Sequence, residues 1–363
     1  MELIAVNDKT RKIFMEFYRS QYVNNPLRRD ALSDLVKGLI YGKSELCKSL
    51  DLEPYMVMDH NKVIMICLLA FAHRMPDYLQ IGFFESSEYN MEAFMLIMKR
   101  AEEFATEKGA KKISGSLNIH VNYGLGFLAN DFDKEQSFGL AHNQEYYHRY
   151  FVKNGFRTIE MLTYKKNITT MEKLLSPNVK DKIEAKYKVR KINLNNLKSE
   201  IALYTRINNE AFVDHLFYYP RKEEEDFELF KDFKYLLKPE NLLFVEKAGA
   251  PVGFMLWYPD FNKLIKPGEK VGIKTVIRNK ISPNKIRNFK LVEMGVVPSE
   301  QGRGAILALF NHCFKCTKGR FDTVESGWIL TENKRSKNFG VKWADAESKQ
   351  FKAYIKDLND GEI

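Results

Sequence analysis

The segment 289–310 carries the residue spacing with the clearest chemical meaning in this sequence. An apolar run, FKLVEMGVV, passes through Pro298 into SEQGRGA and then into an amphipathic stretch. Glycines at 302 and 304, between a strand and a helix, let the backbone approach a ligand, and the first N–H groups of a helix have no partners within it. An anion supplies those partners, and Arg303 adds positive charge. The spacing alone leaves a plain tight turn open as the alternative.

The elements that must position this turn occur twice along the chain. Helical spacing of apolar residues, strand-length apolar runs and turn residues predict the first series of elements at 3–6, 8–23, 54–72, 78–84, 90–109, 111–117, 142–154 and 157–164. The same order of strands and helices begins again at residue 186, with predicted elements at 186–194, 197–215, 224–237, 242–260, 288–298, 305–319, 321–330, 333–343 and 349–358. This repetition indicates an internal duplication of one fold.

The domain organisation follows from the repeat. We expect an α+β protein of two tandem domains, each a mixed, mostly antiparallel sheet flanked by helices. A polar segment containing Ser176 and Pro177 separates the two series, and such a dipeptide interrupts a helix. The predicted boundaries are therefore 1–168 for the first domain, 169–185 for the linker and 186–363 for the second domain.

The turn also resembles a known family motif. The run Val296-Val297-Pro298-Ser299-Glu300-Gln301-Gly302-Arg303-Gly304-Ala305 is similar to the pyrophosphate loop of the GNAT acyltransferase superfamily, whose pattern is Gln or Arg, two residues, Gly, one residue, then Gly or Ala. Ile306 departs from the pattern at its last position. The phrases at 249–262 and 325–334 resemble those of bacterial tandem-GNAT proteins of similar length, so that the resemblance covers nearly the whole chain.

The resemblance implies an N-acyltransferase, most simply an acetyltransferase, that moves an acyl group from acetyl-CoA or another acyl-CoA to the amine of a small molecule or peptide. The residues implied for the cofactor are Val296, Val297, Gln301, Gly302, Arg303, Gly304, Ala305, Ile306 and Asn333. A backbone N–H near Val296 would polarise the thioester carbonyl. Two alternatives stay open: a non-catalytic module that binds a CoA ester or another anion, and an aminoacyl or long-chain acyl transferase.

Three side chains are candidates for proton transfer. Glu293 is an acidic residue in an apolar strand, where burial would raise its pKa toward that of a useful base, although a solvent-facing residue or an ion-pair partner would have the same pattern. Glu325, in the neighbouring predicted strand, is a second candidate base or a buried group that accepts backbone hydrogen bonds. Tyr354 is the nearest candidate in sequence for protonating the leaving thiolate.

Five further residues are candidates for contacts with the acceptor or the acyl group. The first helices of this fold flank the acceptor site, which singles out Asn209, Phe212 and His215. Trp257 and Trp328 could wall the acyl pocket, although strand aromatics more often belong to the core.

The first half lacks the glycine turn. FFESSEY stands between its strand and its helix, with Glu85 and Glu88 where a pyrophosphate would lie, and like charges there repel the cofactor. Phe151 occupies the position at which many family members carry a tyrosine. We therefore expect residues 1–168 to be a degenerate half that shapes the structure or the substrate site.

Composition narrows the class of protein further. Fifty-seven basic and 47 acidic residues give a net charge of +10, which attracts anions, and a basic insertion at 263–288 contributes to it. For this insertion a membrane-facing patch, a lid, a surface for the CoA phosphates and a solvated loop all stay open, with nucleic acid ranked last because stacking aromatics are absent.

Cysteine usage and hydropathy suggest the compartment. Four cysteines without a disulfide pattern favour a reducing cytoplasm, and the longest apolar run, 63–72, is shorter than the roughly 20 residues of a membrane span. The pair Cys313 and Cys316 lacks a second pair of ligands, so that no metal site is expected. A homodimer stays possible.

Overall fold

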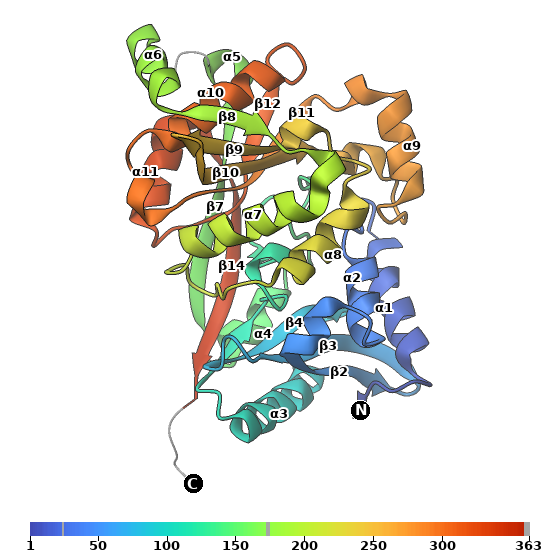
Figure 1. Cartoon of the computed structure of the whole chain (residues 1–363). Helices are drawn as coiled ribbons and strands as arrows, with labels where there is room; N and C mark the ends of the chain where they lie inside the picture. The colour runs from blue at the N-terminus through green and yellow to red at the C-terminus, as the bar shows by residue number, and fades with distance from the viewer. Residues whose placement is uncertain (24, 172–174, 359–363) are drawn as a thin grey trace.

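The computed structural model describes residues 1–23, 25–171 and 175–358, and its strands form one continuous sheet (Figure 1). The strands of the first half are β1 (Glu2–Ala5), β2 (Leu50–Asp59), β3 (Lys62–Ala72), β4 (Tyr78–Ser86), β5 (Lys112–Gly115), β6 (Phe127–Leu128) and β7 (Arg157–Asn167). Those of the second half are β8 (Lys188–Lys191), β9 (Leu242–Lys247), β10 (Ala250–Pro259), β11 (Asn288–Val296), β12 (Thr323–Ser326), β13 (Ile329–Leu330) and β14 (Ala346–Asp357).

The predicted helices lie between these strands, together with four helices that were not predicted. The first half contains α1 (Arg11–Val23), α2 (Ser33–Ile40), α3 (Met91–Lys108) and α4 (Tyr147–Lys153). The segment that joins the halves contains α5 (Ile168–Met171) and α6 (Pro177–Lys186), and the second half contains α7 (Leu197–Ala211), α8 (Glu223–Phe233), α9 (Ile273–Ile281), α10 (Ala305–Thr317) and α11 (Lys334–Trp343). The helices that were not predicted are α2, α5, α6 and α9. The predicted α+β class is confirmed.

Local sequence explains where the predicted helices begin and end. The Asn90 side chain accepts from the N–H of Ala93 at the start of α3, and Gly109 ends that helix at φ 69°. The helix predicted from 142 begins only at Tyr147. Pro177 begins α6, because a proline in the first helical turn has no N–H to leave unpaired. The predicted linker, 169–185, is therefore partly helical, and its residues 172–174 lie outside the described residues.

The sheet joins the two halves by exchanging strands. Its order is β1-β2-β3-β4-β5-β14-β7-β12-β11-β10-β9-β8, with β13 beside β7 and β6 beside β14. The C-terminal strand β14 lies between β5 and β7, where Tyr354 pairs with Gly115 and with Thr158. Strand β7 of the first half in turn pairs with β12 of the second, where Val324 faces Lys166. Each half therefore completes its sheet with a strand from the other.

Helices cover both faces of the sheet. Strand β3 is buried on both sides, since Ile66, Leu68 and Ala70 pack toward α1 and α2 while Met65, Cys67 and Leu69 pack toward α3. Figure 1 shows α1 and α2 on one side of β2–β4 and α3 on the other. In the second half α7 packs against β10 and β11, and α10 packs against β9 and β10. Among the described residues no helix is long and apolar enough to cross a bilayer.

Candidate active site

An opening in the sheet lies between β11 and the strands that follow α10. Parallel pairing of β11 with β12 runs from Asn288–Thr323 to Leu291–Ser326, after which the two strands separate. At this point β11 also contains a bulge, because Leu256 pairs with Glu293 while Trp257 pairs with Leu291. A bulge bends its strand and re-aims the side chains that follow it. The sheet is thus open beyond residue 292.

The backbone of β11 turns hydrogen-bond donors toward this opening. Val297 N–H donates to Val252 O over 2.9 Å, and Gly253 pairs with Val296 in the antiparallel ladder with β10. In such a ladder alternate residues point their N–H groups to opposite edges. The N–H groups of Met294 and Val296 therefore face away from β10 and into the opening, whereas the N–H of Val297 is already used within the sheet.

The glycine turn lies where β11 leads into α10. Gly302 and Gly304 have φ values of 75° and 103°, a region that residues with a side chain rarely adopt. Gly304 is the N-cap of α10 and provides no side-chain acceptor for the first N–H groups. Gln301 Nε2 donates to Val296 O over 3.1 Å and holds the turn against the end of β11. Tyr187 and Lys186 donate to the carbonyl of Arg303 over 3.1 and 3.2 Å.

A cavity of about 1000 Å³ connects the glycine turn with the opening in the sheet. Most of the residues predicted for a site line this cavity, and they come from β11, the glycine turn, the start of α10 and the segments that flank α7, β13 and α11. They are Phe212, His215, Glu293, Val296, Gln301, Gly302, Gly304, Ile306, Trp328 and Asn333. The structure therefore brings together residues that lie up to 121 positions apart in the sequence, from Phe212 to Asn333.

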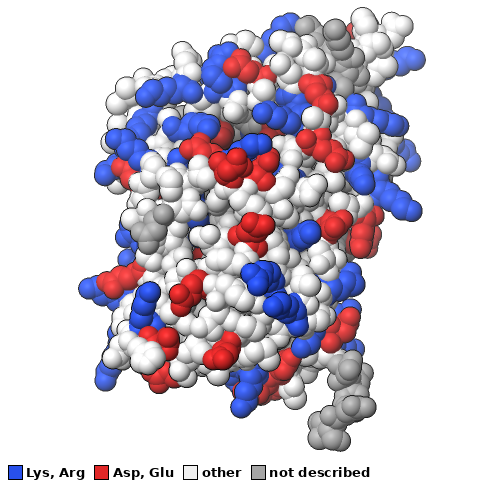
Figure 2. Space-filling model, turned by 180° about the vertical axis from the view of Figure 1, so that it is seen from behind, with Lys and Arg blue, Asp and Glu red and all other residues white. Residues whose placement is uncertain are grey.

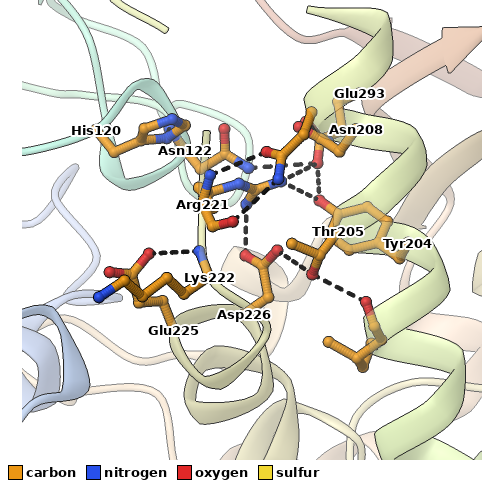
Figure 3. Close-up of polar contacts among 12 residues, drawn as sticks. His120, Asn122, Tyr204, Thr205, Asn208, Arg221, Lys222, Glu225, Asp226 and Glu293 are labelled. Carbon is orange, nitrogen blue, oxygen red and sulfur yellow. Dashed lines mark hydrogen bonds and ion pairs between the residues drawn. The ribbon is translucent and has the colours of Figure 1, made fainter. Parts of the chain in front are cut away.

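Glu293 lies in the wall of this cavity among hydrogen-bond donors (Figure 3). Tyr204 Oη donates to Oε1 of the carboxyl, and Asn208 Nδ2 donates to Oε2 over 3.0 Å. The side-chain oxygen of Asn122 accepts from the Arg221 guanidinium beside this carboxyl. Burial raises the pKa of Glu293 to about 8. A carboxyl group with a pKa near neutrality can exchange a proton with a substrate.

Arg221 connects Glu293 to a second buried acid. Its guanidinium lies 4.0 Å from Glu293 Oε1, 3.3 Å from Tyr204 Oη and 2.7 Å from Asp226 Oδ1. Thr205 Oγ1 donates to Asp226 Oδ2 over 2.6 Å, while burial raises the pKa of Asp226. Figure 3 shows Arg221 between the Asn122 amide, Asp226 and Glu293. This arrangement fixes the side chains around Glu293.

The first half contributes directly to this network through the loop before β6. His120 is buried, and its Nε2 lies 3.1 Å from Tyr219 O while its Nδ1 accepts from the N–H of Asn122 over 3.2 Å. Burial lowers the pKa of His120 well below its ordinary value, and the charge of Arg221 adds to that effect. A neutral His120 therefore holds Asn122 in position beside Glu293.

Comparison with solved structures identifies this architecture. The whole fold superimposes on a tandem GNAT protein from the clavulanic acid biosynthesis pathway with a TM-score of 0.55, covering 99% of each chain at 10% sequence identity. The chain has a tandem GNAT fold. At this level of identity the likeness establishes the fold, and the chemistry has to be argued from the site.

Two curated proteins are similar to this chain over most of its length. Protein YghO of Escherichia coli (strain K12) is 24% identical over 283 residues, which cover 74% of this chain and 71% of the relative. A bacterial ceramide synthase of Caulobacter vibrioides (strain NA1000 / CB15N) is 21% identical over 287 residues, which cover 75% of this chain and 74% of the relative. No family model matches the chain.

Several predicted site residues lie away from the cavity of this GNAT fold. Tyr354 is buried in the core of the first half, where it stacks on Phe151 and lies 2.6 Å from Nδ1 of His148. Its strand, β14, is the exchanged strand, and this placement corrects the expectation that Tyr354 lies close enough to the site to protonate a leaving group. Trp257 is also a core residue and packs on Phe289 and Phe321.

Glu325 and Asn209 have structural partners of their own. Thr163 Oγ1 donates to Glu325 over 2.8 Å, and Ser137 donates to its other oxygen. The side chain thus accepts hydrogen bonds outside the cavity lining and makes no contact with Glu293. Asn209 Nδ2 donates to Arg221 O over 3.0 Å, so that it holds the segment before α8. Val297, Arg303 and Ala305 belong to the glycine turn but do not line the cavity.

Sequence reasoning missed the residues that surround Glu293. Tyr204 and Asn208 lie one helical turn apart on α7, so that both side chains reach the same carboxyl. This i, i+4 pair of polar residues on an otherwise buried helix face was the available signal. Asn122 and Arg221 carried no comparable signal, because they come from loops whose positions depend on how the two halves pack.

The cavity becomes apolar beyond Glu293, on the side of α7 and α8. Its lining there is mainly aromatic and aliphatic and includes Leu32, Phe138, Phe212, Leu229, Phe230, Phe233, Leu256 and Val271. Lys290 is the basic group at this end, where its Nζ donates to Phe138 O over 3.2 Å and burial lowers its pKa to about 8. Within the described residues no cluster of His, Cys, Asp or Glu could hold a metal ion.

Proposed function

We propose that the protein is an N-acyltransferase that moves an acyl group from acyl-CoA to an amine, with Glu293 as the general base. The observation that carries this proposal is the position of Glu293. It faces a cavity that begins at a helix N-terminus suited to phosphate, and its pKa of about 8 fits a base that works near neutral pH.

The glycine turn supports acyl-CoA as the donor. The first N–H groups of α10 lack partners within the helix, and Gly304 brings no side chain that caps them. Lys180 and Lys342 line the same end of the cavity and add positive charge. Gln301, Gly302, Gly304 and Ile306 would hold the pyrophosphate, and Asn333 at the N-cap of α11 borders the same space.

The proposed reaction uses groups that face the opening. The Glu293 carboxylate takes a proton from the amine as its nitrogen attacks the thioester carbonyl carbon. The N–H groups of Met294 and Val296 stabilise the oxyanion that forms. The carbon–sulfur bond then breaks, CoA leaves as its thiolate, and the acyl group remains on nitrogen as an amide. Tyr204 and Asn208 orient the carboxylate, and they keep it in place when it becomes protonated.

The size and lining of the cavity favour long-chain substrates. The apolar region beyond Glu293 offers contact with methylene groups, each of which contributes about 0.8 kcal/mol when buried. One curated relative is named a bacterial ceramide synthase, and a ceramide is the amide of a fatty acid with a long-chain amino alcohol. We therefore propose a long-chain acyl group, a long-chain amine or both as the substrates, in preference to acetyl transfer to a small polar amine.

The proposal is tested by measuring the release of free CoA thiol from acyl-CoA donors of increasing chain length, with a long-chain amino alcohol and a short polar amine as acceptors. We expect turnover with the long-chain acceptor, and we expect kcat/KM for the acyl-CoA donor to increase with the length of its acyl chain. The Glu293→Gln variant should bind the donor as the parent protein does and turn it over about 10²- to 10⁴-fold more slowly.

Two outcomes of this experiment would contradict the proposal. Saturable binding of acyl-CoA without turnover of any amine would favour a non-catalytic module that senses a CoA ester. Absence of binding by the folded protein would remove the acyltransferase function altogether. Leu256→Trp serves as a control for chain length, because it fills the apolar region and should lower activity with long donors more than with short ones.

A further inference from the structure

Helix α9 (Ile273–Ile281) presents an apolar stripe to solvent. Ile273, Ile277 and Ile281 are 80%, 48% and 75% exposed, and they recur every fourth residue. At about 100° per residue this spacing places all three side chains on one face of the helix. A solvent-facing helix of a globular domain normally turns such a stripe inward. In α9 the stripe faces outward.

The opposite face of α9 is firmly held by the protein. Thr275 is 1% exposed, and Arg278 donates to Leu264 O over 2.8 Å and pairs with Glu269. Asn279 Nδ2 lies 3.4 Å from Leu236 O in the segment that follows α8. These contacts fix the orientation of the helix. The isoleucines are therefore exposed even though the helix is packed against the protein.

Basic side chains flank the apolar stripe. Lys274 and Lys280 lie on either side of the isoleucines at helical spacing, and both are exposed. Between residues 263 and 288 the sequence contains eight basic residues and one acidic residue, Glu269. Figure 2 shows lysine and arginine side chains across the upper part of that view, which includes the side on which α9 lies. Apolar side chains bordered by cations match the boundary between anionic headgroups and acyl chains.

The segment next to α9 also exposes an aromatic ring. Tyr235, which directly precedes the Leu236 carbonyl that contacts Asn279 of α9, is 60% exposed. Tyrosine is well suited to a bilayer interface, since its ring is apolar and its hydroxyl is polar.

We propose that α9 docks the protein on the surface of a bilayer that contains anionic lipids. Ile273, Ile277 and Ile281 enter the boundary between headgroups and acyl chains, while Lys274 and Lys280 contact the phosphates. The charge of the helix selects an anionic surface, and the isoleucine stripe selects a lipid phase over a dissolved polyanion. A polyanion such as RNA would leave these apolar side chains in water.

The docking surface adjoins the apolar end of the cavity. Val271 lines the cavity and lies two residues before α9, and Leu229 of α8 lines it as well and is 39% exposed. A lipid-phase molecule at this surface is therefore next to the apolar part of the cavity. The docking itself does not depend on the proposed acyl transfer, because it rests on α9 alone.

Cosedimentation of the full chain with vesicles tests the proposal. We expect binding to vesicles of phosphatidylcholine mixed with phosphatidylglycerol and much weaker binding to phosphatidylcholine alone. Ile277→Asp should weaken vesicle binding about tenfold or more. It removes one aliphatic side chain that would be buried in the bilayer, and it adds a negative charge that the anionic lipids repel. The double variant Lys274→Glu, Lys280→Glu should weaken it by a similar factor, and this loss should shrink as salt is raised.

Matched variants elsewhere on the surface keep the test specific. Val152 of α4 is 57% exposed, so that Val152→Asp places the same charge on an exposed aliphatic side chain away from α9. The pair Lys99→Glu, Lys111→Glu makes the same change in net charge in the first half. Both controls should bind vesicles as the parent protein does. Equal losses in controls and α9 variants would overturn the proposal.

A second measurement separates lipid from protein partners. Sedimentation velocity without lipid should give the same mass for the parent protein and for Ile277→Asp. A dimer that dissociates in the variant would show that a second copy covers the stripe and would overturn docking to a bilayer. Vesicle binding that persists in a Glu293→Gln enzyme without turnover supports docking independently of the proposed reaction.

Discussion

The two halves of the chain open their sheets at the same place and fill the opening differently. In the first half β4 pairs with β5 from Tyr78–Lys112 to Ile81–Gly115, and in the second β11 pairs with β12 over the same number of residues before the strands separate. Beyond this point the second half has a cavity of about 1000 Å³, whereas a space of about 100 Å³ borders Phe84 in the first.

Aromatic side chains close the opening of the first half. Phe84 makes edge contacts with five other rings, namely Phe94, Phe127, Tyr147, Tyr150 and Phe151. A Cβ added at Gly115 would collide with the ring of Phe151, so that this ring lies directly on the strand. Phe151, which stands at the position where many GNAT proteins carry a tyrosine, is therefore a core residue here.

The N-termini of the helices that follow the two openings, α3 and α10, also differ. The Asn90 side chain caps α3, and the hydroxyl of Tyr150 accepts from the N–H of Asn90 over 2.8 Å. At the end of β4 the Arg28 guanidinium donates to Glu85 over 3.0 Å, so that a buried ion pair borders the opening of the first half. The first half thus uses its own side chains as hydrogen-bond partners at its opening, whereas no side chain caps α10 in the second half.

The largest expected effect is that of Glu293→Gln. Removal of a general base typically lowers the rate by about 10²- to 10⁴-fold. Because the pKa of Glu293 is about 8, the base is protonated at lower pH, and the parent rate should rise with pH through about 8. The variant should lose this step in a pH–rate profile. Glu85→Gln, in the first half, should leave the profile unchanged; a shift there would mean that both openings share the chemistry.

The ion pair of the first half should matter for stability rather than for catalysis. Arg28→Met leaves Glu85 buried without its partner, and loss of one member of a buried pair costs about 3–5 kcal/mol. Denaturant unfolding measures this cost. Arg287→Met, at a solvent-exposed pair with Asp322, should change the stability far less than Arg28→Met does, because water screens the exposed pair. Similar costs at the two sites would contradict a structural role for the buried pair.

Gly304→Asp should weaken acyl-CoA binding by about 100-fold. It places a carboxylate where phosphate is expected and a side chain at a φ of 103°, which costs roughly 1–2 kcal/mol by itself. Gly109→Asp puts the same residue at a φ of 69° at the end of α3, in open space. Calorimetric titration should show that only the first substitution affects binding, while thermal unfolding reports the strain that both share.

The smallest effect is expected for Phe84→Leu. The substitution keeps the site apolar and loses the edge contacts between rings, which contribute about 0.5–1.5 kcal/mol. Thermal unfolding should show a small decrease in stability, with acyl-CoA binding unchanged in affinity and stoichiometry. A second equivalent of bound acyl-CoA would mean that the aromatic cluster alone had closed an otherwise functional site.

The fold was largely predictable because its signals are local. Cap residues, helical periodicity and strand-length apolar runs lie within each element, so that α3, α10 and the order of the strands follow from the sequence. The glycine turn and Glu293 were predictable for the same reason, since both belong to one stretch of about 15 residues. Their catalytic and binding roles stay predictions.

The remaining features of the site depend on contacts between distant segments. Arg221 reaches Glu293 because a loop of the second half packs on a loop of the first, where the side-chain oxygen of Asn122 accepts from the Arg221 guanidinium. The expected role of Tyr354 failed for a related reason. Periodicity predicts that β14 is a strand but not which half it joins, and the exchange carries Tyr354 into the core of the first half.

The exchanged strands also affect how the chain is made. Domains of a chain generally fold from the N-terminus during synthesis. The first half, however, lacks β14 (Ala346–Asp357) until the second half has been synthesised, and until then β5 and β7 have unpaired edges. Unpaired edges are templates for aggregation. A nonsense mutation before β14 would therefore destabilise the first half as well as the second, so that the first half can complete its fold only after the 12 residues of β14 have been made.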